Sequence, residues 1–66
     1  MADIALRLPD DEAMALAQLV KRVDYDRILL FASTRATYGD RSEADTMWAG
    51  VLLLQRQLAE AGFDPR

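Results

Sequence analysis

The chain contains no cysteine and no histidine. Without cysteine, no disulfide can stabilise the fold. Structural zinc is not expected either, because zinc sites in proteins are built mainly from these two residue types. The same absences remove the commonest general base and the commonest nucleophile of enzyme active sites. We therefore expect a protein that is not an enzyme and that holds neither a metal ion nor a cofactor.

Lysine and long apolar runs are also scarce. Lys21 is the single lysine and the net charge is −3, so the chain as a whole repels nucleic acid, whose binding relies on lysine and arginine. No apolar run approaches the roughly 20 residues that cross a bilayer. The start, Met1-Ala2-Asp3, has no basic segment and no apolar segment follows it, so no signal peptide is expected. These features predict a cytoplasmic protein with no membrane partner and no direct nucleic-acid partner.

The length of 66 residues predicts a single domain, residues 1–66. A domain this short buries about 60% of the surface that its unfolded chain exposes. One core of this size contributes on the order of 3–5 kcal/mol of stability. Since disulfides and zinc are excluded, association with a second copy is the remaining means of support. We therefore expect a homodimer.

Residues 3–8 alternate apolar Ile4, Leu6 and Leu8 with small or charged residues, which is the pattern of a half-buried strand. A strand must pair its backbone groups with another strand, and no second strand pattern occurs in the chain. Pairing with the same segment of a second copy would solve this problem. The alternative is an irregular N-terminal arm that packs on the helices. The predicted fold is therefore mostly α, with a short N-terminal strand or arm followed by three helices in a small bundle.

The first helix is expected over residues 9–23. Pro9 suits the first helical position, and the acidic residues that follow it suit the positive end of the helix dipole. Lys21 and Arg22 suit the opposite end. One apolar stripe with helical spacing runs along this segment and comprises Ala13, Leu16, Leu19, Val20 and Val23.

The second helix is expected over residues 27–38, which are apolar around most of the helix circumference. A helix of that kind belongs in the middle of a structure. Asp24 or Asp26 is expected to cap its start, and Gly39 is expected to cap its end. No glycine or proline separates it from the first helix, so the alternative is one continuous or kinked helix.

The last helix is expected from Ser42 to the residues before Gly62, which is a natural stop signal. Ser42 with Asp45 resembles a capping box in which aspartate replaces the usual glutamate or glutamine. Gly50 lies inside this helix at a cost of roughly 1 kcal/mol relative to alanine, which predicts close approach by another part of this chain or by a second copy. The apolar stripe of this helix comprises Ala44, Met47, Trp48, Val51, Leu52, Leu58 and Ala59, with Leu54 at its edge. Leu53 points away from that stripe and is a candidate contact.

Two sets of residues are candidate binding sites. The first is a dimer contact formed by Ile4, Leu6, Gly50 and Leu53. The second is an acidic surface for a protein partner, and its members are Asp10, Asp11, Glu12, Asp45 and Glu60. The simplest role of these acids is to keep a small domain soluble. A more specific role is to imitate a DNA backbone, because complementary charge speeds encounter with a basic partner.

The segments 4–12 (Ile-Ala-Leu-Arg-Leu-Pro-Asp-Asp-Glu) and 41–43 (Arg-Ser-Glu) resemble the strand and the two helix starts of ribbon–helix–helix repressors and antitoxins. That resemblance implies a dimer whose paired strands enter the DNA major groove. Residues 24–40 are far longer than the short turn of that family. On the outward face of residues 3–8, Arg7 is the residue suited to reading bases.

The segments 8–13 and 58–66 resemble short proteins of phages and plasmids in proteobacteria. Size, acidity and helicity are also similar to those of anti-CRISPR proteins, several of which imitate DNA to block a surveillance complex. This resemblance implies an inhibitor in the cytoplasm of a bacterial host cell, bound to a basic nucleic-acid groove of a CRISPR effector complex.

The leading hypothesis is therefore a non-catalytic acidic inhibitor of the anti-CRISPR type. The alternatives are a dimeric ribbon–helix–helix-like regulator or antitoxin that associates through residues 3–8, and a structural adaptor that uses Gly50 and Leu53.

Overall fold

One long amphipathic helix provides the surface on which the other elements pack. The computed structural model of the protein describes residues 1–65. In chain order its elements are α1 (Asp10–Arg22), α2 (Tyr25–Phe31), β1 (Thr37–Tyr38), β2 (Arg41–Ser42) and α3 (Glu43–Glu60). The expected mostly helical fold with three helices is confirmed.

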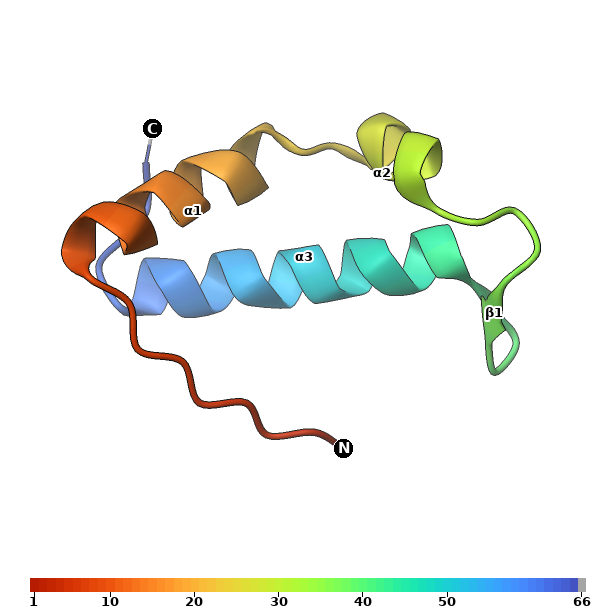
Figure 1. Ribbon diagram of the computed structural model, residues 1–66, viewed down its shortest axis with the longest axis horizontal. Coiled ribbons are helices and arrows are strands. Elements are labelled where there is room, and N and C mark those ends of the chain that lie inside the picture. The colour runs from red at the N-terminus through yellow and green to blue at the C-terminus, as the bar shows by residue number, and fades with distance from the viewer. Residues whose placement is uncertain (66) are drawn as a thin grey trace.

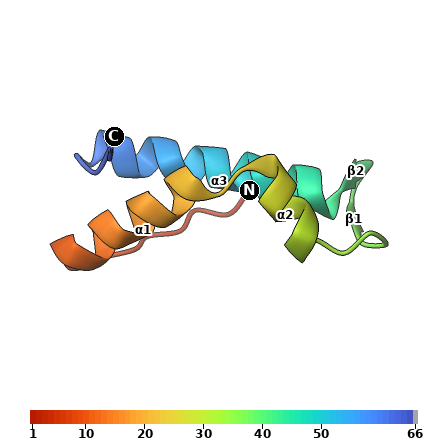
Figure 2. The same cartoon turned by 90° about the horizontal axis from the view of Figure 1, so that it is seen from above.

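The helices α1 and α2 pack on opposite halves of α3, as Figure 1 shows. The helix α1 lies along the C-terminal half of α3, and α2 lies near its N-terminal half. Within residues 1–65, α1 and α2 do not contact each other. Figure 2, seen from above, shows the two helices following one another along α3. The molecule is accordingly long and thin, with extents of 37 × 26 × 15 Å.

The core is small and consists mainly of small side chains. Its buried residues are Ala13, Ala17, Val20, Ile28, Ala44 and Leu58. Alanines at the contact allow α1 to approach α3 closely, and Leu58 of α3 packs between Ala17 and Val20 of α1. The predicted apolar stripes of the first and last helices therefore face each other in part. Leu19 of the first stripe and Leu52 of the last are 59% and 45% exposed and lie outside the contact.

The predicted helix over residues 27–38 is wrong beyond Phe31, where α2 ends. Side chains satisfy the backbone groups that would have continued it. The Ser33 Oγ accepts hydrogen bonds from the N–H groups of Arg35 and Ala36, and the Glu43 Oε1 accepts one from the N–H of Ser33. Such side-chain bonds compete with helix propagation. The Asp24 cap is confirmed, because its Oδ1 accepts from the N–H of Arg27 at 2.9 Å.

The prediction that this helix lies in the middle of the structure is also wrong. Ile28 is its buried residue, whereas Leu30 and Phe31 are 80% and 73% exposed. Because α2 has seven residues and touches α3 on one side, the other apolar side chains of its circumference face solvent.

Residues 37–42 form a β-hairpin that the sequence analysis missed. Its strands pair Thr37 with Ser42 and Tyr38 with Arg41 in antiparallel register. Gly39 has a φ of +69° and forms the turn, instead of capping a helix, because glycine adopts this conformation at no steric cost. Strands of two residues are too short to show a two-residue period, so the pattern could not reveal them.

Residues 1–9 form an extended arm and not a strand. Within residues 1–65 no backbone hydrogen bond joins residues 1–8 to the rest of the chain. One copy of the chain therefore has the N-terminal arm of the alternative prediction and not the strand. The arm does not pack closely on the helices as that alternative expected, since residues 1–7 are exposed.

The ends of α3 follow the predicted signals. Ser42 Oγ accepts from the N–H of Asp45 at 3.1 Å, which confirms the cap. At the other end Gly62 has a φ of +99°, and its N–H bonds to the carbonyl of Ala59 while the N–H of Phe63 bonds to that of Leu58. These are the two bonds of a Schellman motif. Among residues 1–65 no helix combines the length and the apolar character needed to cross a membrane.

Candidate partner-binding surface

Four of the five acids in the predicted partner site lie at one end of the molecule. The start of α1, with Asp10, Asp11 and Glu12, and the end of α3, with Glu60, lie at the same end of the long axis (Figure 1). Figure 2 shows that the two segments lie on opposite sides of the molecule in its thin direction. Ala13 of α1 and Ala61, which follows α3, line one groove between the two segments. All four acids are exposed. We call this set, Asp10, Asp11, Glu12 and Glu60, the acidic end.

The helix dipoles do not cancel the charge of the acidic end. The N-terminus of α1 contributes about half a positive charge, against three carboxylates in its first turn. Glu60 lies in the last turn of α3, where the dipole is negative and no basic residue is present. An acid in that position is unfavourable for the helix, so helix stability does not explain it. The region therefore remains negative.

Three of the seven basic side chains in residues 1–65 donate hydrogen bonds to groups outside the acidic end. Lys21 Nζ donates to the carbonyl of Pro65, Arg22 to the amide oxygen of Gln18, and Arg41 to the carbonyl of Asp45. The hydrogen bond that the acidic end itself makes runs from the N–H of Glu12 to Asp11 Oδ1 at 2.8 Å. Within residues 1–65 no basic side chain donates a hydrogen bond to these four acids, so their carboxylates are accessible to an external cation.

Asp45 is not brought together with the other four acids. It lies in the first turn of α3, about 22 Å along the helix axis from Glu60 at 1.5 Å per residue. Its Oδ1 accepts a hydrogen bond from the Tyr25 hydroxyl at 2.6 Å. Within residues 1–65 its carboxylate accepts no hydrogen bond from the N–H of Ser42, so the capping box is incomplete. Asp45 has a role within the fold, where it links α2 to α3.

Tyr25, Trp48 and Asp45 form a small cluster that the sequence analysis did not foresee. The rings of Tyr25 and Trp48 meet edge to face, with centroids 6.2 Å apart and planes at 72°, a favourable geometry for aromatic pairs. The hydrogen bond to Asp45 raises the pKa of Tyr25 above 10.0, and desolvation and the nearby negative charge act in the same direction. The three residues come from α2 and α3, so no local spacing could have connected them.

This cluster predicts a delayed titration of Tyr25 at alkaline pH. Because the protonated hydroxyl donates the bond, its contribution to stability is present below pH 10.0 and is lost as the pH rises through the raised pKa of Tyr25. In a Tyr38→Phe background, near-ultraviolet tyrosinate absorbance reports Tyr25 alone. Adding Asp45→Ala should lower its pKa towards the ordinary value. An unchanged titration curve would show that this hydrogen bond is absent in solution.

Three of the predicted dimer contacts lie near one another, and the fourth does not join them. Ile4 and Leu53 line one hollow, and Ile4 and Leu6 line a neighbouring groove. Ile4 and Leu6 are 86% and 65% exposed. A Cβ added at Gly50 would meet no atom of a packed neighbour within 4 Å. The close approach that the sequence predicted there therefore does not occur within residues 1–65.

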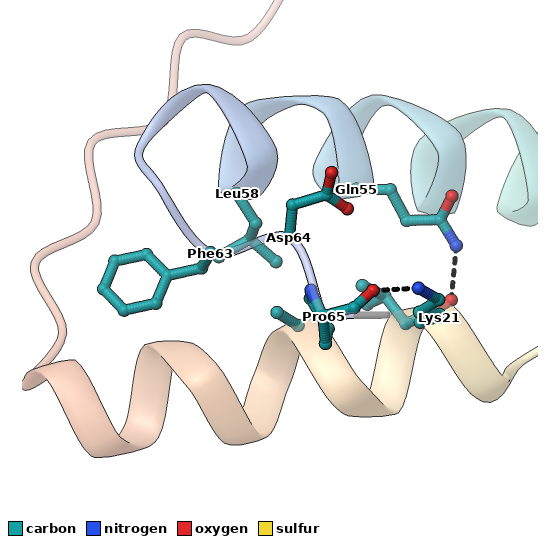
Figure 3. A pocket seen from close by; sticks show the side chains of 8 residues that line it. Lys21, Gln55, Leu58, Phe63, Asp64 and Pro65 are labelled. Atoms are coloured by element: carbon teal, nitrogen blue, oxygen red, sulfur yellow. Dashed lines mark hydrogen bonds between the residues drawn. The ribbon is translucent and has the colours of Figure 1, made fainter.

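A small cavity of about 130 Å³ lies where the segment after α3 crosses α1 (Figure 3). Gln55 Nε2 donates to the carbonyl of Val20, and Lys21 Nζ to that of Pro65. Val20 belongs to the last turn of α1, whose carbonyls have no partner within the helix. The polar groups of this cavity therefore serve to join α1 to α3 and to residues 63–65.

In the described part of the chain, no three His, Cys, Asp or Glu side chains come close enough to hold a metal ion. The model of a family of unknown function, DUF7706, matches residues 1–66. Comparisons with curated proteins and with solved structures return no match.

Proposed function

Because the chain belongs to DUF7706, a family of unknown function, we propose its role from its geometry: it is a non-catalytic protein that presents its acidic end to a basic groove on another protein. The observation that carries this proposal is the presence of Asp10, Asp11, Glu12 and Glu60 at one end of the molecule. Within residues 1–65 no basic side chain donates a hydrogen bond to any of these four acids. The molecule is 15 Å across in its thinnest direction, which suits insertion of a narrow end into a groove.

The narrower form of the proposal is that the groove normally holds nucleic acid. Carboxylates spaced along a helix turn offer repeated negative charge, as phosphates do, to the lysines and arginines of such a groove. On this view the chain is an inhibitor of the anti-CRISPR type, and its target is the DNA-binding groove of a CRISPR effector complex. Asp45 is not part of the proposed surface, since it is bonded to Tyr25.

The test is competition between the protein and DNA. A purified, guide-loaded effector complex and a fluorescent target duplex serve as the probe, and increasing amounts of the protein should displace the duplex. Asp10→Lys with Glu12→Lys should weaken that inhibition by at least about tenfold, because reversed charges oppose a basic partner. Raising the salt concentration should weaken the wild type too, since the Debye length shrinks to about 3 Å at 1 M.

A matched control separates the acidic end from net charge. Asp26→Lys with Asp40→Lys changes the net charge by the same amount, and both residues are exposed and lie outside the acidic end. This pair should inhibit nearly as well as the wild type. If both double variants lose inhibition to the same extent, the acidic end is not the binding surface. No displacement of the duplex by the wild type would remove the CRISPR effector as the target.

The second candidate function is a dimeric DNA-binding regulator, which the exposed and unpaired arm favours. A gel shift with random duplex DNA separates the two functions. The proposed inhibitor should not retard DNA at moderate salt, because its net charge is −3. Retarded DNA would favour the regulator.

A further inference from the structure

The chain exposes more surface than a folded protein of its mass requires. Its accessible surface is 5607 Å², whereas a monomer of 7.4 kDa is expected to expose about 4,200 Å². Its radius of gyration is 13.1 Å, against about 11 Å for a typical domain of this length. The surplus of about 1,400 Å² exceeds the roughly 800 Å² that each partner buries in a standard interface.

Part of this surplus lies in a groove between the N-terminal arm, α1 and α3. The groove has a volume of about 480 Å³, and its walls include Ile4, Leu6, Leu8, Leu16, Leu54 and Phe63. We call it the arm groove. The alternating apolar side chains of the arm all line it, and Gln57 is its one polar lining residue among those described. An open apolar groove of this kind is a site for a protein partner.

The N-terminal arm, which forms one wall of the groove, makes few stabilising interactions within the described chain. Ile4 and Leu6 remain largely exposed, and residues 1–8 make no backbone hydrogen bond within the described chain. An extended segment with free N–H and C=O groups and an apolar face is stable when another chain covers it. An apolar surface that covers both the groove and the arm would therefore stabilise the two together.

We propose that a second copy of this chain covers the arm groove, so that the same face of each copy is buried about a two-fold axis. A two-fold contact uses one self-complementary surface, and the arm groove supplies both projecting side chains, Ile4 and Leu6, and a hollow to receive them. The surplus area of each copy is enough for such an interface. This inference goes beyond the proposed function, because dimerisation through the arm groove neither requires nor excludes binding of a basic partner at the acidic end.

The exposed apolar side of α2 is the competing surface. Leu29, Leu30 and Phe31 are exposed there, and they line none of the hollows named above. The test therefore places one substitution on each surface, Leu6→Asp in the arm groove and Leu30→Asp on α2. Both side chains are more than half exposed, so the fold should tolerate either change.

Sedimentation equilibrium over a concentration series measures the outcome. The wild type and Leu30→Asp should be dimers, and Leu6→Asp should raise the dimer dissociation constant by at least about 100-fold, since two apolar contacts are lost per dimer. A monomeric wild type would overturn the proposal. A dimer that Leu30→Asp breaks and Leu6→Asp leaves intact would assign the interface to α2 instead.

A second measurement decides the question if Leu6→Asp fails to fold. The chain has no cysteine, so Leu6→Cys and Leu30→Cys each introduce a single thiol with little change in polarity. The alkylation rate of the Leu6→Cys thiol should fall at least about tenfold as protein concentration rises, because the dimer buries that thiol. The alkylation rate of Leu30→Cys should not depend on protein concentration. Equal rates at all concentrations would refute burial of the arm groove. Neither measurement depends on a cationic partner, so this proposal and the proposed function can fail separately.

Discussion

Leu58→Ala is expected to leave a large share of the protein unfolded at room temperature. Leu58 is 8% exposed and packs on Ala17 and Val20 across the contact between α1 and α3. Truncating a buried leucine to alanine costs about 2–5 kcal/mol, and a core of this size supplies about 3–5 kcal/mol in total. The two quantities nearly cancel. Urea denaturation followed by circular dichroism, at one fixed protein concentration, measures the loss.

A matched substitution on α1 serves as the control. Leu19→Ala removes the same atoms from a side chain that is 59% exposed, so the free energy of unfolding should change by about 0.5 kcal/mol or less. If the two variants lose similar stability, the contact between α1 and α3 described above is not what holds the helices together.

Ile28→Ala is expected to release α2 while leaving α1 in place. Ile28 is 6% exposed and is the buried residue of α2, and its truncation costs about 2–5 kcal/mol. A helix of seven residues is not stable on its own, since isolated helices need about 12–15 residues even in favourable sequences. Hydrogen exchange at the amide of Ala32, which bonds to the carbonyl of Ile28, should therefore accelerate strongly.

The amide of Ala17 in α1 provides the comparison within the same sample. Because α1 contacts α3 and not α2 in the described structure, its exchange should change far less. Leu30→Ala, on the exposed side of α2, should have little effect at either amide. Equal acceleration in α1 and α2 would mean that the whole chain unfolds as one cooperative unit.

Helices α1 and α3 could be predicted because two independent signals agree in each. A stripe with a period near 3.6 marks the buried face, and the chemistry of the ends marks the boundaries. Asp10 to Glu12 and then Lys21 and Arg22 match the dipole of α1, and Ser42 and Gly62 bracket α3. Each boundary falls within one or two residues of its prediction, the normal uncertainty of helix ends.

The segment 25–42 could not be predicted in the same way. Residues 27–38 are apolar on all sides, so their pattern does not identify one buried face. It predicted a long central helix, whereas α2 is short and lies at the surface. The bonds that end α2 come from Ser33 and from Glu43, ten residues further along. The carboxylate of Glu43 reaches the N–H of Ser33 only in the folded chain, where the hairpin brings the start of α3 close to the end of α2.

The candidate site was predicted in part. Asp10, Asp11 and Glu12 are neighbours in sequence, and the antiparallel packing of α1 on α3 adds Glu60. Projection on a single helix placed Asp45 on the same side as Glu60, but it could not show that Tyr25 would bind its carboxylate. A helical projection shows which side of a helix a residue lies on, but not how far apart two residues lie along the helix axis.

The separate docking of α1 and α2 on α3 also bears on the order of folding. Elements α2, β1, β2 and α3 follow one another without interruption from residue 25 to residue 60, so their contacts close short loops and carry a small entropy cost. The contact of α1 with the far half of α3 closes a much longer loop. We therefore expect the downstream elements to assemble early and α1 to attach last, completing the groove beside the arm in the final step.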